Sequence, residues 1–139
     1  MAAGSDEPGS LLDNVALALP ALKRASKLGK RASSCGFDWP DSAGPRAKII
    51  EELGEIDAAQ QAGDFAAIED EVGDLLFSVV NLARHLRVDP EAALAAANNK
   101  FMRRFRQMEG VLRDAGRDPA DMSIDELEEA WQHAKTSVG

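Results

Sequence analysis

The sequence predicts an all-α protein, a helical bundle of about five helices. Alanine and leucine are abundant among the 139 residues, whereas runs of Val, Ile and Thr, which favour strands, are sparse. Apolar residues recur at the three- and four-residue spacing of a helix, and no segment alternates convincingly with the period of two expected of a strand. With 45% hydrophobic residues, a chain of this length can bury the core of one domain.

Proline, glycine and capping residues indicate where each helix begins and ends. Residues 1–10 contain Gly and Pro and are expected to form a disordered tail, so that the single domain covers residues 11–139. Three prolines suit the first turn of a helix, Asp64 suits an N-cap, and the string SIDE from Ser123 has the pattern of a capping box. These signals predict helices over residues 20–34, 45–62, 64–86, 90–115 and 123–135.

The composition argues against several classes of function. A net charge of −8 makes a nucleic-acid polymer an unsuitable partner, because binding a polyanion requires a concentrated basic surface. The single cysteine, Cys35, excludes an intramolecular disulfide and is interpreted as a small, half-buried residue. The longest apolar stretch, LLFSVVNLA, is too short to span a membrane, and the N-terminus lacks the features of a signal peptide. We expect a cytoplasmic protein without a membrane partner.

Five carboxylates occur in two short strings, EELGE at residues 51–55 and EVGD at residues 71–74. The tight turn QAGD makes the two predicted helices antiparallel neighbours, so residues equally distant from Gly63 lie at the same height. Glu52 and Asp74 are each eleven residues from Gly63, and Glu55 and Glu71 are each eight residues from it. The two levels are about 4.5 Å apart at 1.5 Å per residue. Four carboxylates should therefore converge between the helices.

The apolar pattern predicts that this convergence lies on a partly buried face. Glu71 is in angular line with an apolar stripe that should be buried, made of Leu75, Val79, Leu82 and Leu86. On the preceding helix, Glu52 and Glu55 border a second stripe, made of Ile49, Leu53 and Ile56. An acidic helix face is most often simply solvated, but the matching heights and the apolar surroundings favour a built site here.

Carboxylates gathered on such a face need a counter-charge. Burying like charges is costly unless a pKa shift, an ion pair or a metal compensates them, and the basic partner that the hairpin offers close to the acidic strings is Lys48. No thiolate or imidazole lies close in the sequence to indicate zinc, whereas oxygen ligands suit Mg²⁺ or Mn²⁺. Since Mg²⁺ usually keeps positions for water and phosphate, the pattern points to phosphate chemistry.

Candidate phosphate contacts occur later in the chain. The string NNKFMRRFR places Asn98, Lys100 and Arg104 at or near the borders of an apolar helix stripe. Trp131 and Lys135, four residues apart, pair an aromatic plate with a cation. Each group has a plain alternative, because the basic residues could form a solvated face and Trp131 could pack in the core. The sequence contains no glycine-rich phosphate loop.

Four strings together, EELGE, EVGDLLFSVVNLARHL, AANNKFMRRFRQME and LEEAWQHAK, resemble the MazG family of nucleoside triphosphate pyrophosphohydrolases over residues 14–136. The family pattern is EExxE, a spacer and ExxD, and the spacer here has fifteen residues. The resemblance implies an all-α fold that forms tight homodimers or higher oligomers. It also implies Mg²⁺-dependent hydrolysis of NTPs or dNTPs to the monophosphate and pyrophosphate, with a housecleaning role. The chain looks like the C-terminal, catalytic half of tandem family members.

Matching positions give each site residue an expected role. The resemblance implies that the metal is held by Glu52, Glu55, Glu71 and Asp74, and that Glu51 positions water or acts as a base. It implies substrate contacts for Asn98, Lys100, Arg104, Trp131 and Lys135. Two alternatives stay open. One is a narrower enzyme acting on dUTP, dCTP or phosphoribosyl-ATP, and the other is a non-catalytic helical module for regulation or dimerisation.

Overall fold

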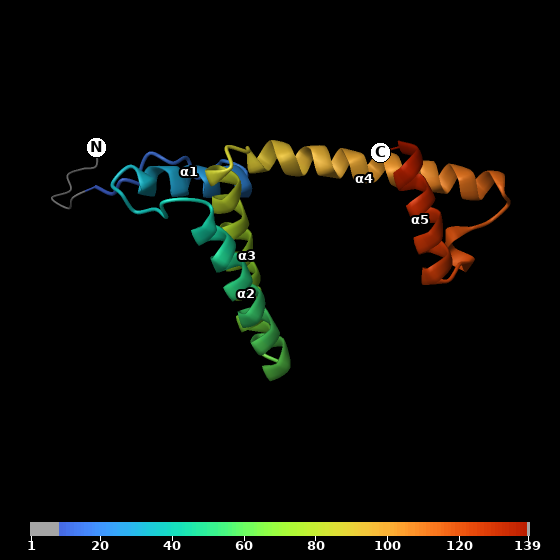
Figure 1. Cartoon of the computed structure of the whole chain (residues 1–139), viewed down its shortest axis with the longest axis horizontal. Helices are drawn as coiled ribbons and strands as arrows, with labels where there is room; N and C mark the ends of the chain where they lie inside the picture. The colour runs from blue at the N-terminus through green and yellow to red at the C-terminus, as the bar shows by residue number, and fades with distance from the viewer. Residues whose placement is uncertain (1–8, 139) are drawn as a thin grey trace. The chain divides into compact units, whose positions relative to one another are not determined.

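The computed structural model describes residues 9–138, and every regular element there is helical (Figure 1). The elements are α1 (Ala21–Ser33), α2 (Ala43–Ala62), α3 (Phe65–His85), α4 (Pro90–Asp114), a short 3₁₀ turn at Pro119–Asp121, and α5 (Ile124–Val138). The prediction of an all-α protein with about five helices is confirmed. The tail predicted for residues 1–10 lies, up to residue 8, outside the described residues. The chain divides after Glu91 into two compact units.

Helices α2 and α3 form the predicted antiparallel hairpin (Figure 1). Gly63 ends α2 in the left-handed region, with φ of 67°, where a residue with a Cβ is disfavoured. Asp64 then caps α3, because its side chain accepts a hydrogen bond from the Ala67 N–H at 3.1 Å. The two residues of the turn therefore cap both helices and fix the register of the hairpin, on which the carboxylate prediction depends.

Helix α1 packs against α3 at a glycine. Gly29 is buried, and a Cβ at this position would lie 2.6 Å from Asn81 Oδ1 and 3.0 Å from Arg84 Nε. The first unit also buries Val80 and Pro45 almost completely. The backbone of α1 thus approaches the polar side chains of α3 as closely as only a glycine permits.

The buried stripe predicted on α3 is only partly correct. Leu75 and Leu82 are half-buried, but Val79 and Leu86 are exposed, and the most buried α3 residues are Ser78, Val80 and Asn81. The reason is geometric, because α1 and α2 cover one side of α3 while its apolar residues extend over a wider arc. One apolar face of α3 remains open among the described residues.

In the second unit, α5 folds back on the C-terminal half of α4. Met108, Leu112 and Ala134 form its buried core, with Trp131 among the partly buried residues around them. The predicted capping box is confirmed, since the Ser123 N–H donates to Glu126 Oε1 at 3.0 Å and the Glu126 N–H donates to Ser123 Oγ at 3.2 Å. The sequence therefore located the start of α5 correctly.

Cys35 is exposed rather than half-buried, because it lies in the turn that follows α1 and no other element covers it. No helix in the described part of the chain is both long enough and apolar enough to cross a membrane.

Candidate metal centre

Three carboxylates converge on the α2–α3 hairpin. Glu52, Glu71 and Asp74 each offer one oxygen, and these oxygens all lie within 4.8 Å of one another. The counting of heights from Gly63 predicted that four carboxylates converge, and three of them do, whereas Glu55 lies outside the group. Such a spacing would allow one cation to contact all three groups, since oxygen ligands surround Mg²⁺ at about 2.0–2.1 Å and Ca²⁺ at 2.3–2.6 Å.

Glu52 is the buried member of the group, with 4% of its surface exposed. Its Oε1 lies 3.5 Å from Lys48 Nζ, whereas its Oε2 is buried and has no hydrogen-bond partner among the described residues. A buried carboxylate oxygen without a donor costs free energy unless a proton or a cation reaches it. The protein therefore retains a buried acceptor on one of the three grouped carboxylates.

The electrostatics of the cluster raise the pKa of Glu71 to about 7. The largest cause is the contact with the Glu52 carboxyl group, and burial and the charges of Glu52, Glu55 and Asp74 add to it. A raised carboxyl pKa is the signature of like charges held close together. A cation would remove the same repulsion without the proton.

The donor set fits a hard divalent cation. All three groups are carboxylates from rigid helices, and one of them is buried with a free oxygen. Oxygen-rich sites of this kind suit Mg²⁺ and Mn²⁺ rather than zinc, which is usually bound with nitrogen or sulfur ligands. The cluster is thus able to hold a hard divalent cation.

The other two acidic residues of the motif lie at the edge of the cluster. Glu55 is exposed and is outside the group of three converging oxygens, although its charge contributes to the raised pKa of Glu71. Glu51 is exposed too, and its Oε2 accepts a hydrogen bond from Lys48 Nζ at 2.6 Å. This bond is the main cause that raises the pKa of Lys48. Lys48 therefore links Glu51 to the buried Glu52.

A cavity of about 490 Å³ adjoins the cluster within the first unit. Glu52 and Asp74 form one part of its lining, and Lys48 lies beside them. The opposite part is mainly apolar and comes from α1 and the loop after it, including Leu28, Ala32, Phe37 and Trp39. A carboxylate cluster that opens into an apolar cavity can bind a ligand with a charged end and an apolar body.

The remaining predicted site residues belong to α4 and α5. Asn98 and Lys100 are exposed, and Arg104 is half-buried with an Nε that has no hydrogen-bond partner among the described residues. Trp131 packs against Phe101, with ring centroids 5.2 Å apart, and against the core of the second unit. Lys135 is exposed. Trp131 therefore has a packing role, as its alternative interpretation expected.

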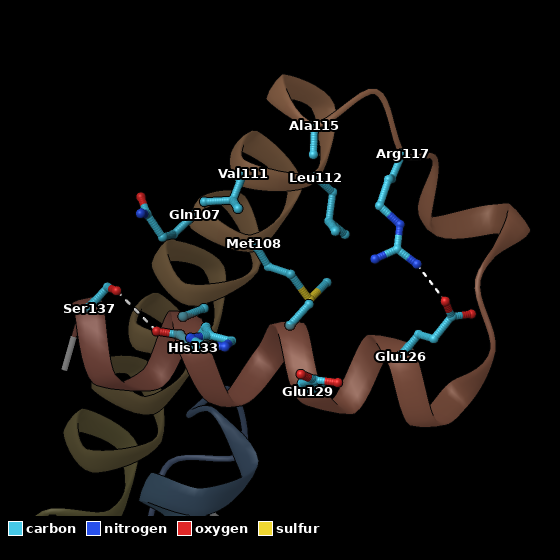
Figure 2. A pocket seen from close by; sticks show the side chains of 12 residues that line it. Gln107, Met108, Val111, Leu112, Ala115, Arg117, Glu126, Glu129, His133 and Ser137 are labelled. Carbon is cyan, nitrogen blue, oxygen red and sulfur yellow. Dashed lines mark hydrogen bonds and ion pairs between the residues drawn. The ribbon is translucent and has the colours of Figure 1, made fainter.

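A different cavity, of about 320 Å³, lies between α4 and α5 (Figure 2). Apolar side chains such as Met108 and Leu112 line it, together with His133 and the Arg117–Glu126 ion pair at its edge. None of the site residues predicted from the sequence lines this cavity. The acidic motif and the α4–α5 cavity are thus separate features of the chain.

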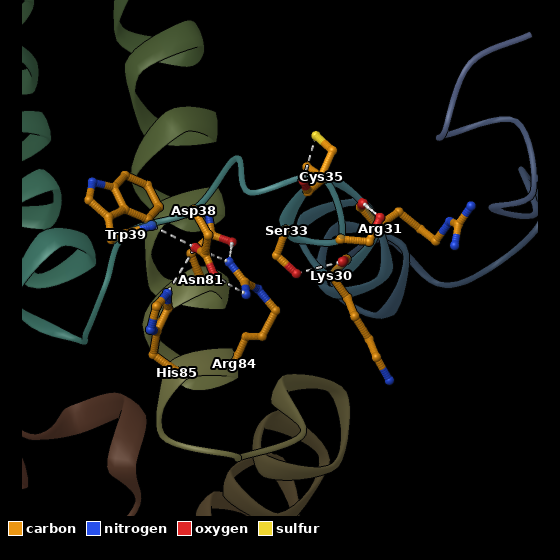
Figure 3. Close-up of polar contacts among 11 residues, drawn as sticks. Lys30, Arg31, Ser33, Cys35, Asp38, Trp39, Asn81, Arg84 and His85 are labelled. Atoms are coloured by element: carbon orange, nitrogen blue, oxygen red, sulfur yellow. Dashed lines mark hydrogen bonds and ion pairs between the residues drawn. The ribbon is translucent and has the colours of Figure 1, made fainter.

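The sequence did not single out a polar cluster that borders the cavity of the first unit (Figure 3). Arg84 donates two parallel hydrogen bonds to the Asp38 carboxylate, each 2.9 Å long, and His85 Nε2 lies 3.0 Å from Asp38 Oδ1. The partners are 46 residues apart, so no local spacing reveals them. The one sequence feature that could have indicated this polar cluster is Asn81, a polar residue inside the apolar run VVNLA. Asn81 is buried beside Arg84.

Comparisons with known proteins agree with the acidic hairpin. Residues 44–108 match the family model of the MazG nucleotide pyrophosphohydrolase domain. The chain is 44% identical over 128 residues to the nucleoside triphosphate pyrophosphohydrolase of Escherichia coli strain K12. It is 45% identical over 117 residues to the nucleoside triphosphate pyrophosphohydrolase/pyrophosphatase MazG of Thermotoga maritima, and 41% identical over 127 residues to the uncharacterized protein YabN of Bacillus subtilis.

These alignments cover most of the chain but only part of each relative. The alignment with the Escherichia coli protein covers 91% of the chain and 49% of that protein. The alignment with the Thermotoga maritima protein covers 84% of the chain and 45% of that protein, and the alignment with YabN covers 91% of the chain and 26% of YabN. The chain thus spans about half the length of the two named pyrophosphohydrolases. The matched family model includes both acidic strings and the first part of α4. Residues 44–108 thus resemble the MazG domain, and the likeness to the two named pyrophosphohydrolases extends over most of the chain.

Proposed function

We propose that the chain hydrolyses nucleoside triphosphates, NTPs or dNTPs, to the monophosphate and pyrophosphate with the aid of a divalent cation. The observation that carries the proposal is the buried Glu52 carboxylate, which meets Glu71 and Asp74 with one oxygen left without a donor. Its position inside a matched MazG domain supports the assignment. Two relatives named as nucleoside triphosphate pyrophosphohydrolases share this part of the chain.

Glu52, Glu71 and Asp74 would hold Mg²⁺ or Mn²⁺, with Glu55 near enough to assist. When bound, the cation supplies polarisation of a phosphoryl oxygen and a site for water. Glu51 is exposed beside the cluster and is held by Lys48, which suits a residue that positions water or accepts its proton. Lys48 has a further effect, because its charge partly compensates the two carboxylates before any ligand arrives.

Substrate contacts are proposed for Asn98, Lys100 and Arg104 on α4 and for Trp131 and Lys135 on α5. The exposed amide and cations on α4 are suited to phosphate oxygens, and the Nε of Arg104 has no competing partner among the described residues. A substrate contact has less support for Trp131 than for the α4 residues, because Trp131 already packs against Phe101.

A homodimer, or a higher assembly of the same chain, is also proposed. Val72, Leu76, Val79 and Leu86 follow one face of α3 and are exposed, as are Ile50 and Leu53 on α2. An apolar stripe of this length on a helical hairpin is typical of a protein–protein interface. We further propose that residues 11–139 act as one functional domain in the cytoplasm.

The test is product analysis by ion chromatography for a panel of NTPs and dNTPs, with and without Mg²⁺. Wild type should release monophosphate and pyrophosphate only with the metal. Glu52→Gln should lose activity by about 100-fold or more, because removing a group that stabilises transition-state charge costs about 2.7–4 kcal/mol. Glu69→Gln, an exposed carboxylate on the same hairpin, should remain active.

Other outcomes would separate the alternatives. Turnover restricted to one base, or to phosphoribosyl-ATP, would indicate a narrower enzyme. Metal binding by the folded wild type without turnover of any nucleotide would contradict the proposal and favour a non-catalytic helical module.

A further inference from the structure

The loop between α1 and α2 is attached to α3 by an ion pair. Arg84 Nη1 lies 2.9 Å from Asp38 Oδ2 and Arg84 Nη2 lies 2.9 Å from Asp38 Oδ1, which is the two-pronged geometry that guanidinium groups form with carboxylates. The two side chains are 16% and 21% exposed, so solvent screens the pair only partly. The Arg84 guanidinium is also the main cause that lowers the pKa of Asp38. Figure 3 shows the two groups facing one another across the loop.

The surroundings hold both partners in place. Arg84 Nη2 also donates to Asn81 Oδ1 at 3.2 Å, and Asn81 is buried under Gly29 of α1. Asp38 accepts a hydrogen bond from the Trp39 N–H at 2.9 Å and contacts His85. The carboxylate of Asp38 thus connects the loop backbone to two residues of α3.

Trp39 is fixed as a consequence. Its indole meets the His85 ring edge-on, with centroids 6.4 Å apart, and lies so close to Gly44 that a Cβ there would be 2.1 Å from it. Phe37, Asp38 and Trp39 line the same cavity as Glu52 and Asp74. The loop is therefore one wall of the cavity into which the carboxylate cluster opens.

We propose that Asp38 and Arg84 are positioning residues, whose ion pair holds Phe37 and Trp39 as the wall that keeps a triphosphate substrate in place beside the carboxylates. The proposal rests on the proposed function. Neither residue needs to touch the phosphates, because each acts through the loop. Loss of the pair should therefore weaken substrate binding more than it slows the chemical step.

Steady-state kinetics test this role directly. Asp38→Asn and Arg84→Met should each raise KM for a nucleoside triphosphate by about 10-fold, while kcat changes by less than about 3-fold. The double variant should show the same KM as either single variant, because residues that act as a unit are not additive. Arg84→Lys keeps the charge but not the two parallel bonds, so it should resemble Arg84→Met. Asp57→Asn, an exposed carboxylate of α2, is the matched control.

Tryptophan fluorescence gives a readout that needs no turnover. In a Trp131→Phe background Trp39 is the only tryptophan of the chain, and its quenching by acrylamide reports how tightly the loop is held. Asp38→Asn and Arg84→Lys should increase quenching by about 2-fold, whereas Asp57→Asn should not change it. The kinetic measurements use the chain with both tryptophans.

The outcomes distinguish this inference from the proposed function. If wild type is active and the variants keep both its KM and its Trp39 quenching, the ion pair does not position the loop. A lower melting temperature with unchanged KM and quenching would show a merely structural role and would equally overturn the inference. If wild type turns over no nucleotide, the proposed function fails, and unchanged quenching would then overturn the loop attachment as well.

Discussion

Glu52 and Glu71 bring two carboxyl oxygens within 4.8 Å of one another, and this contact with Glu52 is the main reason that the pKa of Glu71 rises to about 7. The two residues come from different helices, one buried and one half-buried, and Asp74 lies beside them. In the absence of a cation, the pair therefore takes up a proton as the pH falls below about 7.

The pH dependence of stability should reflect this proton. The folded pKa of Glu71 lies near 7 against an ordinary value of 4.5, so between these values the folded chain binds more protons than the unfolded chain. The free energy of unfolding of the metal-free protein should then decrease as the pH rises from 4.5 through 7. Urea titrations across this range would measure it. Glu52→Gln should flatten the decrease, and an unchanged slope in that variant would contradict the assignment.

Divalent cations should stabilise the folded protein through the same cluster. Mg²⁺ or Mn²⁺ should raise the melting temperature of wild type. At a cation concentration 100-fold above Kd, the free energy of unfolding should increase by about 2.7 kcal/mol. Glu52→Gln and Asp74→Asn should each lose most of this effect, since each removes a ligand. Scanning calorimetry checks the prediction, with Glu69→Gln expected to respond like wild type. An equal metal response in all four proteins would place the site elsewhere.

The glycine of α1 should tolerate no side chain. In Gly29→Ala the new Cβ would lie 2.6 Å from Asn81 Oδ1, so either α1 or the polar cluster must move. Overpacking of this kind costs about 1–3 kcal/mol. Urea unfolding followed by circular dichroism would measure the loss. Gly54→Ala on α2, where no atom lies within 4 Å of the added Cβ, is the control and should be neutral or stabilising.

The exposed face of α3 should control assembly. Leu76 is 53% exposed and lies on the stripe with Val72 and Val79. Leu76→Glu should shift a dimer toward monomer in analytical ultracentrifugation, because a charge would be buried at the interface. Leu17→Glu, at a site that is 84% exposed in the segment before α1, should leave the mass unchanged. A wild type that sediments as a monomer at all concentrations would contradict the proposed dimer.

The capping box at the start of α5 should contribute measurably to the free energy of unfolding. Ser123→Ala removes the acceptor for the Glu126 N–H and should lower the free energy of unfolding by about 1 kcal/mol. Thermal unfolding of the variant would detect the change, and Ser123→Asn should preserve most of the stability because Asn also caps helices well.

Local signals made most of the fold predictable. Gly63 and Asp64 act on neighbouring residues, so the sequence alone fixed the turn and, through it, the heights of the carboxylates. The meeting of Glu52, Glu71 and Asp74 followed from that register. Their partial burial was harder to predict, because it depends on how α1 and α2 cover α3, which also left Val79 exposed against expectation.

The polar cluster of Asp38, Arg84 and His85 could not be predicted from the sequence for a different reason. Asp38 sits in an irregular segment, and its partners Arg84 and His85 look like ordinary basic residues in the last turn of a helix. Nothing in their spacing relates them, since the contact joins positions 46 residues apart. Only the packing of α1 on α3 through Gly29 brings the two segments together.

The carboxylate arrangement and the cavity wall depend on contacts of different sequence separation, so substitutions can alter one without the other. The carboxylates belong to one hairpin closed by a two-residue turn, so their convergence requires only short-range folding. The wall formed by Phe37 and Trp39 requires the Asp38–Arg84 bridge and the docking of α1. Changes in the loop can therefore reshape the cavity while the three carboxylates of the hairpin keep their arrangement.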